Sequence, residues 1–214
     1  MKKYLLSLCF GFCFILPSSS QQAQIQKRTT NPFAFSKFRD ATVTFFFNRK
    51  GKAEANIFLK NSKLCFMQNG KVMEAFVEKV LSVDFGNDII YMKMDSIMGR
   101  VIAQKKNNYL LRVTTIDLET YKEETGNGNN LPYFSMEDFG VFIQVDGDAH
   151  ETLQGYPLKN TFYFIHKGKS IPAVQREFKK YVRADKKLDF RNLMNDKYWS
   201  WKDEESLKTL LDYL

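Results

Sequence analysis

The densest set of possible metal ligands in the chain lies at residues 146–151, which read Asp-Gly-Asp-Ala-His-Glu. Carboxylate oxygens at alternate positions, here Asp146 and Asp148, are typical of Ca²⁺ sites, and the imidazole of His150 adds a ligand for a transition metal. A calcium loop also needs Gly at its sixth position and an acid at its twelfth, where this chain has Glu151 and Pro157. We therefore expect a polar turn here and no bound metal.

A cysteine nucleophile is the second chemical option. Cys65 lies inside the apolar run Leu-Cys-Phe-Met at residues 64–67, a pattern typical of a buried strand. A catalytic cysteine needs a histidine positioned beside it, and the chain has only His150 and His166. We expect Cys65 to be a buried, unreactive thiol.

No sequence motif identifies a catalytic group or a cofactor site. The chain has no nucleophile elbow, phosphate-binding loop or zinc motif, and the glycine-rich loop at 126–130 lacks the dinucleotide-binding spacing. Acid–base chemistry by two carboxylates stays open, but it requires two of the many acidic side chains to converge across a cleft. The catalytic residues are therefore unknown, and no cofactor is expected.

Aromatic side chains near the C-terminus are the candidates for ligand contact. Tyr198, Trp199 and Trp201 lie within four consecutive residues, where their rings could stack on a sugar. The alternative is that the two tryptophans anchor the last helix to the rest of the fold. Both interpretations place these residues just before the C-terminal helix.

The N-terminus has the three parts of a secretory signal peptide. Two lysines at positions 2 and 3 precede a thirteen-residue apolar run at 4–16, and Pro-Ser-Ser-Ser follows at 17–20. The apolar run is too short to span a bilayer as a permanent anchor. We expect cleavage after Ser20 and export to the periplasm or the extracellular space. Cleavage removes Cys9 and Cys13, and no transmembrane segment is expected in the mature chain.

The central elements are predicted to be strands. Residues 41–116 consist of short apolar segments with alternating polarity, each separated from the next by a turn signal, of which Asn69-Gly70 is the strongest. About eight such segments predict an antiparallel β-meander, barrel- or sandwich-like. Several strands carry apolar residues on both faces, so we expect a second layer on one face. The fold class is thus α+β, mainly β.

Helices are predicted after the meander. Residues 117–125 have helical spacing with Asp117 as the cap, and a later helix is expected with Ser170 as its cap and Pro172 in its first turn. Residues 203–214 carry an apolar stripe at helical spacing: Leu207, Leu210, Leu211 and Leu214. The expected layout is a signal peptide (1–20), a flexible leader (21–40), a β-meander domain with an acidic loop region (41–156), and a strand plus C-terminal helical subdomain (157–214).

Charge is distributed unevenly along the chain. Residues 21–116 have a formal net charge of +9, residues 117–156 of −8, and residues 157–214 of +5. A sequence pI of about 9.2 often indicates nucleic-acid binding, but a signal peptide argues against that partner. The acidic stretch either packs near basic surface or meets a basic partner or a cation.

The last sixty or so residues resemble small uncharacterised secreted proteins of bacteroidete-type bacteria. The resemblance rests on Phe-Tyr-Phe-Ile at 162–165, Lys-Gly-Lys at 167–169, Phe-Lys-Lys-Tyr at 178–181, Asp-Lys-Lys at 185–187 and Trp-Lys-Asp-Glu-Glu-Ser-Leu at 201–207. It implies a location in the envelope or outside the cell, and it supplies no activity and no functional residue.

These patterns favour a secreted or periplasmic, non-enzymatic protein that acts as a binding or envelope-associated module. Its expected partner is a protein or a glycan of the cell envelope. The alternative is a cell-envelope hydrolase with a carboxylate-based site. A deep cleft with converging acids would favour the enzyme, whereas a charged or aromatic patch on a β surface would favour the binding module.

Overall fold

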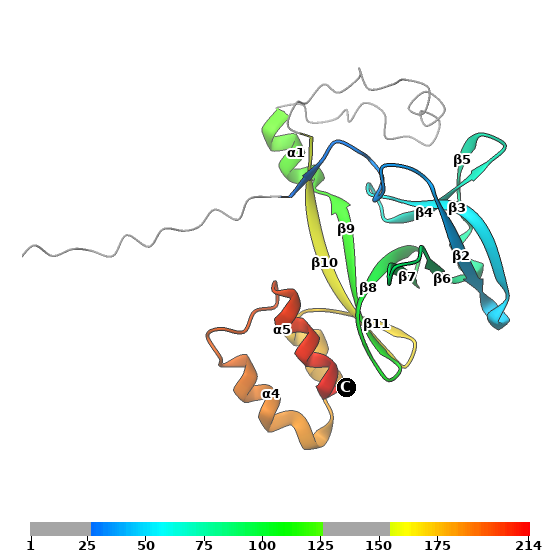
Figure 1. Ribbon diagram of the computed structural model, residues 1–214. Coiled ribbons are helices and arrows are strands. Elements are labelled where there is room, and N and C mark those ends of the chain that lie inside the picture. The colour runs from blue at the N-terminus through cyan, green and yellow to red at the C-terminus, as the bar shows by residue number, and fades with distance from the viewer. Residues whose placement is uncertain (1–26, 126–154) are drawn as a thin grey trace, which may run out of the picture.

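The computed structural model describes residues 27–125 and 155–214. The expected signal peptide, the glycine-rich loop and the possible metal ligands at 146–151 lie outside these residues. The described part is mainly antiparallel β-sheet with short helices near the C-terminus (Figure 1). The predicted class, α+β and mainly β, is confirmed.

The described strands form one eleven-stranded sheet made of two meanders. The first contains β2 (Arg39–Phe45), β3 (Lys50–Phe58), β4 (Lys63–Gln68) and β5 (Lys71–Glu74). The second contains β6 (Val80–Asp84), β7 (Ile90–Met94), β8 (Ile97–Lys105), β9 (Asn108–Ile116), β10 (Tyr156–His166) and β11 (Lys169–Pro172). Pairing of β2 with β6 joins the two meanders.

The residue types in the turn between β4 and β5 explain why this hairpin forms. Asn69 and Gly70 have φ of 51° and 73°, and they connect β4 to β5 where Gln68 faces Lys71. Both residue types tolerate positive φ, as the twist of a two-residue hairpin requires. The predicted hairpin at Asn69-Gly70 is therefore confirmed.

The sheet is open and curved rather than closed into a barrel or split into a sandwich. Its strand order begins with β1 (Arg28–Thr29) and ends with β5, so β1 and β5 lie at opposite ends of the sheet. The turn between β3 and β4 nevertheless reaches across the curve. Ser62 accepts a backbone bond of 2.8 Å from Met98 of β8, and Leu59 accepts one of 2.9 Å from Ile116 of β9.

A first core lies between the first meander and strands β6 and β8. It consists of buried apolar residues from β2, β3, β4, β6 and β8, together with Phe85: Ala41, Val43, Ala55, Ile57, Leu64, Val80, Val83, Phe85 and Met98. Removal of these side chains from water stabilises the packing of β2, β3 and β4 with β6 and β8.

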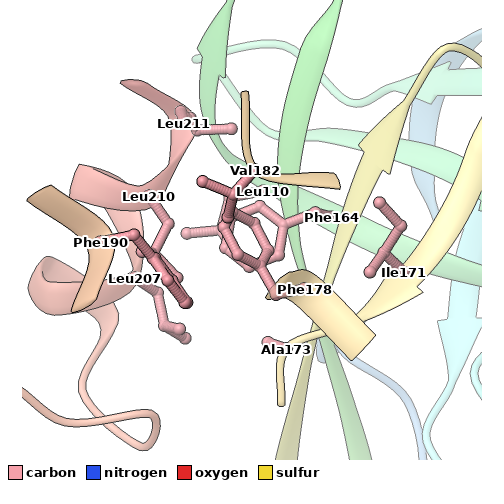
Figure 2. Close-up of a cluster of buried hydrophobic side chains, with 10 residues drawn as sticks. All are labelled: Leu110, Phe164, Ile171, Ala173, Phe178, Val182, Phe190, Leu207, Leu210 and Leu211. Atoms are coloured by element: carbon pink, nitrogen blue, oxygen red, sulfur yellow. The ribbon is translucent and has the colours of Figure 1, made fainter. Parts of the chain in front are cut away.

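A second core lies between the sheet and the C-terminal helices (Figure 2). The helical segments are α3 (Gln175–Phe178), α4 (Lys187–Met194), α5 (Glu204–Thr209) and the 3-10 turn η6 (Leu210–Tyr213). Leu207, Leu210 and Leu211 face Phe164 of β10 and Leu110 of β9. The predicted leucine stripe is confirmed as a core stripe, and α5 begins after Asp203, whose carboxylate accepts from the Ser206 amide at 2.7 Å.

The prediction that a helix begins at Ser170 is wrong. Residues Lys169–Pro172 are instead β11, where Ile171 pairs with Phe164 of β10 and is 1% exposed. Burial of Ile171 beside a strand outweighs the local capping signal, and the helix begins only at Gln175. Helix formation at residues 117–125 is confirmed as α1 (Leu118–Thr125).

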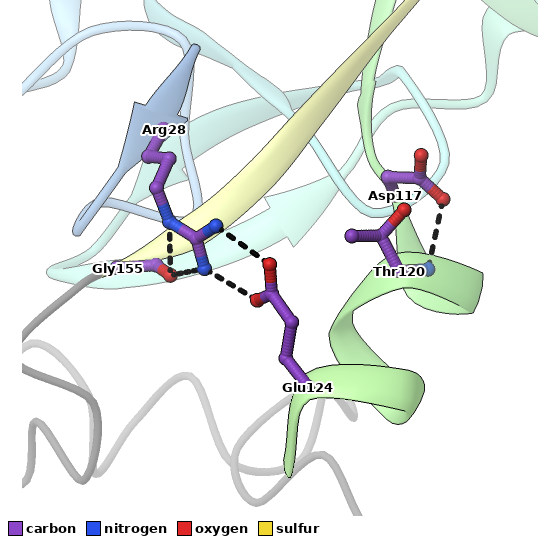
Figure 3. Close-up of polar contacts among 5 residues, drawn as sticks. All are labelled: Arg28, Asp117, Thr120, Glu124 and Gly155. Carbon is purple, nitrogen blue, oxygen red and sulfur yellow. Dashed lines mark hydrogen bonds and ion pairs between the residues drawn. The ribbon is translucent and has the colours of Figure 1, made fainter. Parts of the chain in front are cut away.

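The segment predicted to be a flexible leader is ordered from residue 27 onward. Phe33 is buried against Phe58, and β1 pairs with the start of β10. Arg28 donates two hydrogen bonds to the Glu124 carboxylate, at 3.0 and 2.7 Å, and others to the Gly155 carbonyl (Figure 3). The leader is thereby tied to the end of α1 and to the start of β10.

Candidate functional site

Two of the three aromatic residues proposed for ligand contact, Trp199 and Trp201, pack against each other and against the second core. The rings of Trp199 and Trp201 meet edge to face, with centroids 4.8 Å apart, and both are half-buried against the second core. The indole N–H of Trp199 donates to the Ser206 carbonyl at 3.2 Å. Tyr198 is exposed beside Lys197. This arrangement supports anchoring of the last helix, and none of the three lines the pockets described below.

Cys65 has the environment of an unreactive thiol. Cys65 lies on β4, which pairs with β3 and β5, and its side chain is fully buried. Burial, followed by the nearby charge of Glu74, raises the pKa of the Cys65 thiol to about 12, although Lys63 opposes the shift. The thiolate that a nucleophile requires is therefore not populated near neutral pH.

Both a metal site and the alternative hydrolase would require several carboxylates to lie close together. Within residues 27–125 and 155–214, no group of three or more His, Cys, Asp or Glu could hold a metal ion. Asp117 and Glu119 line one shallow depression, but Asp117 also accepts from the Thr120 amide at 3.3 Å as the cap of α1 (Figure 3). The two acids do not face each other across a deep cleft, as the hydrolase alternative would require.

An apolar groove of about 730 Å³ lies over the first meander. Its floor is formed by β2, β3 and β4, and the connection from β5 to β6 borders it. We call it the apolar groove; it is lined by Val43, Phe45, Lys52, Ala53, Ala55, Leu64, Phe66, Met67, Gln68, Ala75, Phe76, Glu78, Lys79 and Val80. Val43, Ala55, Leu64 and Val80 also belong to the first core, so the groove opens directly onto buried apolar side chains.

An aromatic tip continues the groove at the turn between β2 and β3. We define it by Phe45, Phe46, Phe47, Arg49 and Lys50, which line a further concavity of about 630 Å³ together with Lys79. Phe45 and Lys79 line both concavities, so the two are adjacent. Apolar side chains thus line the surface from the first core out to the tip.

The aromatic tip holds Phe47 in an unfavourable backbone conformation. The Phe45 amide donates to the Arg49 carbonyl at 2.7 Å, and this closure leaves Phe47 at φ 62° and Asn48 at φ 54°. A left-handed conformation costs about 1–2 kcal/mol for a residue with a Cβ. Phe47 is also 96% exposed, so no burial offsets that cost. A strained, exposed aromatic residue is a feature typical of functional sites.

Exposed apolar surface and positive charge coincide around the groove. Phe76, at its edge, is 91% exposed. Four cationic side chains line the groove or the tip, Arg49, Lys50, Lys52 and Lys79, against a single acid, Glu78. The ion pairs found in the described part of the chain involve none of these four cations. The arrangement can accept an apolar chain and neutralise an anionic group at its end.

Sequence reasoning missed this site, although two signals for it exist. Three consecutive phenylalanines, Phe45 to Phe47, break the alternation expected of a strand that faces water on one side. They precede the basic run Arg-Lys-Gly-Lys at 49–52, whose composition is also that of an ordinary polar turn. The role of Phe76 depends on how the connection from β5 to β6 crosses the sheet, and no local pattern encodes that.

The comparisons with known proteins give no relative. A scan against protein families finds no match. Searches of the curated proteins and of the solved structures likewise find no significant match. None of the helices in the described ranges is both long and apolar enough to cross a membrane.

Proposed function

We propose that this chain is an exported, non-enzymatic binding protein whose apolar groove takes the hydrocarbon chain of an anionic amphiphile. The observation that carries the proposal is the apolar groove of about 730 Å³, lined mainly by apolar side chains and adjacent to a cationic aromatic tip. Ligand pockets for organic molecules typically range from about 300 to 1,000 Å³. The groove volume therefore suits a single acyl chain.

The lining favours an amphiphile over the other expected partners. Each buried methylene group contributes about 0.8 kcal/mol, so eight of them supply about 6 kcal/mol toward binding. A glycan would require an array of hydrogen-bonding groups, whereas Gln68 is the only amide side chain that lines the groove. Lys52 and Lys79 provide charge for a carboxylate or phosphate head group.

The aromatic tip and Phe76 supply a route from a lipid surface into the groove. Exposed aromatic and apolar side chains beside basic ones are typical of segments that rest in the interface of an anionic membrane. Phe46 and Phe47 meet that description together with Arg49 and Lys50. Export, expected from the signal peptide, would place this surface beside the lipids of the cell envelope.

Displacement of a fluorescent fatty-acid probe from the mature chain tests the proposal. A long-chain fatty acid should displace the probe at micromolar concentrations. The double variant Lys52→Glu/Lys79→Glu should weaken fatty-acid binding by about tenfold or more, because two attractive charges become repulsive. An uncharged monoacylglycerol, which shares only the chain, should bind both proteins within about threefold.

Lys169→Glu serves as the matched control, because it reverses one exposed charge on β11, outside the groove. Fatty-acid affinity in this variant should equal that of the parent. Failure of every acyl ligand to displace the probe, or equal losses in the control and in the double variant, would overturn the proposal.

A further inference from the structure

A second, smaller pocket lies between the leader, the turn after β3 and the middle of strands β7 to β9. Its volume is about 200 Å³, and its polar lining includes Ser62, Tyr91, Arg100, Arg112 and Thr114. The full lining is Lys27, Arg28, Thr29, Phe33, Ala34, Ile57, Leu59, Ser62, Tyr91, Arg100, Arg112, Thr114 and Leu158. It contains four cations, and no Asp or Glu of the described ranges contributes to it. This pocket is distinct from the apolar groove, with which it shares no lining residue.

Strand register places two of these cations directly against each other. Arg100 of β8 is the cross-strand partner of Arg112 of β9, and Tyr91 of β7 is the partner of Arg100 on the other side. Like charges directly opposite on a sheet destabilise the pair. Both arginines are half-buried, so solvent screens them less than it would on an open surface.

The carboxylates nearby neutralise only part of this charge. Arg112 donates to Glu204 of α5 at 2.7 Å. The guanidinium of Arg28 is occupied by both oxygens of Glu124 and by the Gly155 carbonyl (Figure 3). Among residues 27–125 and 155–214, the guanidinium of Arg100 has no hydrogen-bond or ion-pair partner, although the backbone of Arg100 pairs with β7 and β9. The pocket is therefore left with an excess of positive charge centred on Arg100.

We propose that Arg100 and Arg112, with the hydroxyl of Tyr91, form a binding site for a tetrahedral oxyanion group, phosphate or sulfate, free or as a monoester. The planar guanidinium presents paired donors that match two oxygens of such a group, and a buried pair of this kind is stronger than a neutral hydrogen bond. The volume of about 200 Å³ is below the usual lower limit of about 300 Å³ for drug-sized ligands. The site thus fits the anionic group rather than a whole large molecule.

Calorimetric titration and thermal melts of the mature chain, at constant ionic strength, test the site. Inorganic phosphate and sulfate should bind and raise the melting temperature, whereas acetate, which is planar and carries one charge, should have a smaller effect. Arg100→Gln should weaken phosphate binding by about tenfold to a hundredfold, as expected from the loss of a charged hydrogen-bonding partner. Glycerol phosphate distinguishes an ester head group from the free ion, because only an open site admits the ester.

Arg176→Gln is the matched control, because it removes the same charge from a side chain that is 92% exposed. Phosphate affinity should stay within about twofold in this variant. Without phosphate, Arg100→Gln should melt at or above the parent temperature, since it removes repulsion from Arg112, and Arg100→Lys should bind phosphate with intermediate affinity. A parent protein that binds none of the oxyanions, or an Arg100→Gln variant that binds phosphate like the parent, overturns the proposal.

Discussion

At the scale of single residues, Asn56 shows how one buried amide can order a segment. Its side-chain oxygen accepts from the amides of Phe35 and Ile57, at 3.1 and 2.9 Å, and its side-chain nitrogen donates to the carbonyls of Phe35 and Lys37, at 2.9 and 3.2 Å. The alternation of β3 predicts Asn56 on a polar outer face, yet it is 1% exposed. Three of the four bonds hold the leader onto the sheet.

Substitution of Asn56 by alanine should lower the free energy of unfolding by about 2–4 kcal/mol, because several backbone groups of the leader lose their partners at once. Denaturant melts measure the loss. Asn192→Ala is the control, since Asn192 is exposed on α4 and its replacement should change stability by less than about 0.5 kcal/mol. Equal stabilities for Asn56→Ala and the parent would mean that the leader is not held through this side chain.

At the scale of elements, the sequence predicts individual strands and hairpins better than the way in which these elements pack together. The pair at β8 and β9 and the hairpin at Asn69-Gly70 follow from alternation and turn chemistry, which are local. Residues Lys169–Pro172 carry equally local helix signals but form β11, because Ile171 becomes buried beside Phe164. Neither the groove nor the arginine pocket could be predicted, since each depends on the curvature of the sheet and on cross-strand register.

The turn between β2 and β3 allows a test of whether the strained backbone conformation of Phe47 serves membrane binding. Phe47→Gly should stabilise the protein by about 0.5–1 kcal/mol, because the relief of a left-handed conformation exceeds the added entropy of the unfolded chain. The same variant should weaken binding to anionic vesicles, because an exposed ring is lost. Thermal melts and vesicle co-sedimentation measure the two effects.

Phe47→Ala separates the two contributions. Alanine removes the ring but keeps the Cβ that causes the strain, so this variant should lose vesicle binding without gaining stability. If Phe47→Gly neither stabilises the protein nor changes its vesicle binding, the turn carries no strain and the aromatic tip does not contact lipid.

At the scale of the whole molecule, strand β8 connects the two cores. Met98, near its start, belongs to the first core, whereas Ile102 and Ala103, further along, pack against the second. Ion pairs between Arg112 and Glu204 and between Lys105 and Asp212 also join the sheet to the C-terminal helices. The helical subdomain should therefore unfold together with the sheet as one cooperative unit.

Leu210→Ala tests this coupling, because Leu210 is fully buried against the sheet (Figure 2). The variant should lose about 2–5 kcal/mol, a large part of a typical stability of about 5–15 kcal/mol. Both tryptophans of the chain, Trp199 and Trp201, lie beside the helices, so their fluorescence follows the second core, whereas far-UV circular dichroism follows the secondary structure of the sheet and the helices together. Urea transitions measured by the two signals should move to lower urea by the same amount and should stay coincident.

Lys208→Ala is the control on the same helix. Lys208 is partly exposed and pairs with Glu204 and Glu205, and surface ion pairs of this kind contribute at most about 1 kcal/mol. In Leu210→Ala, a fluorescence transition that moves to lower urea ahead of the main dichroism transition would show that the helices unfold separately. The sheet would then be stable without them, and β8 would not transmit the loss of one core to the other.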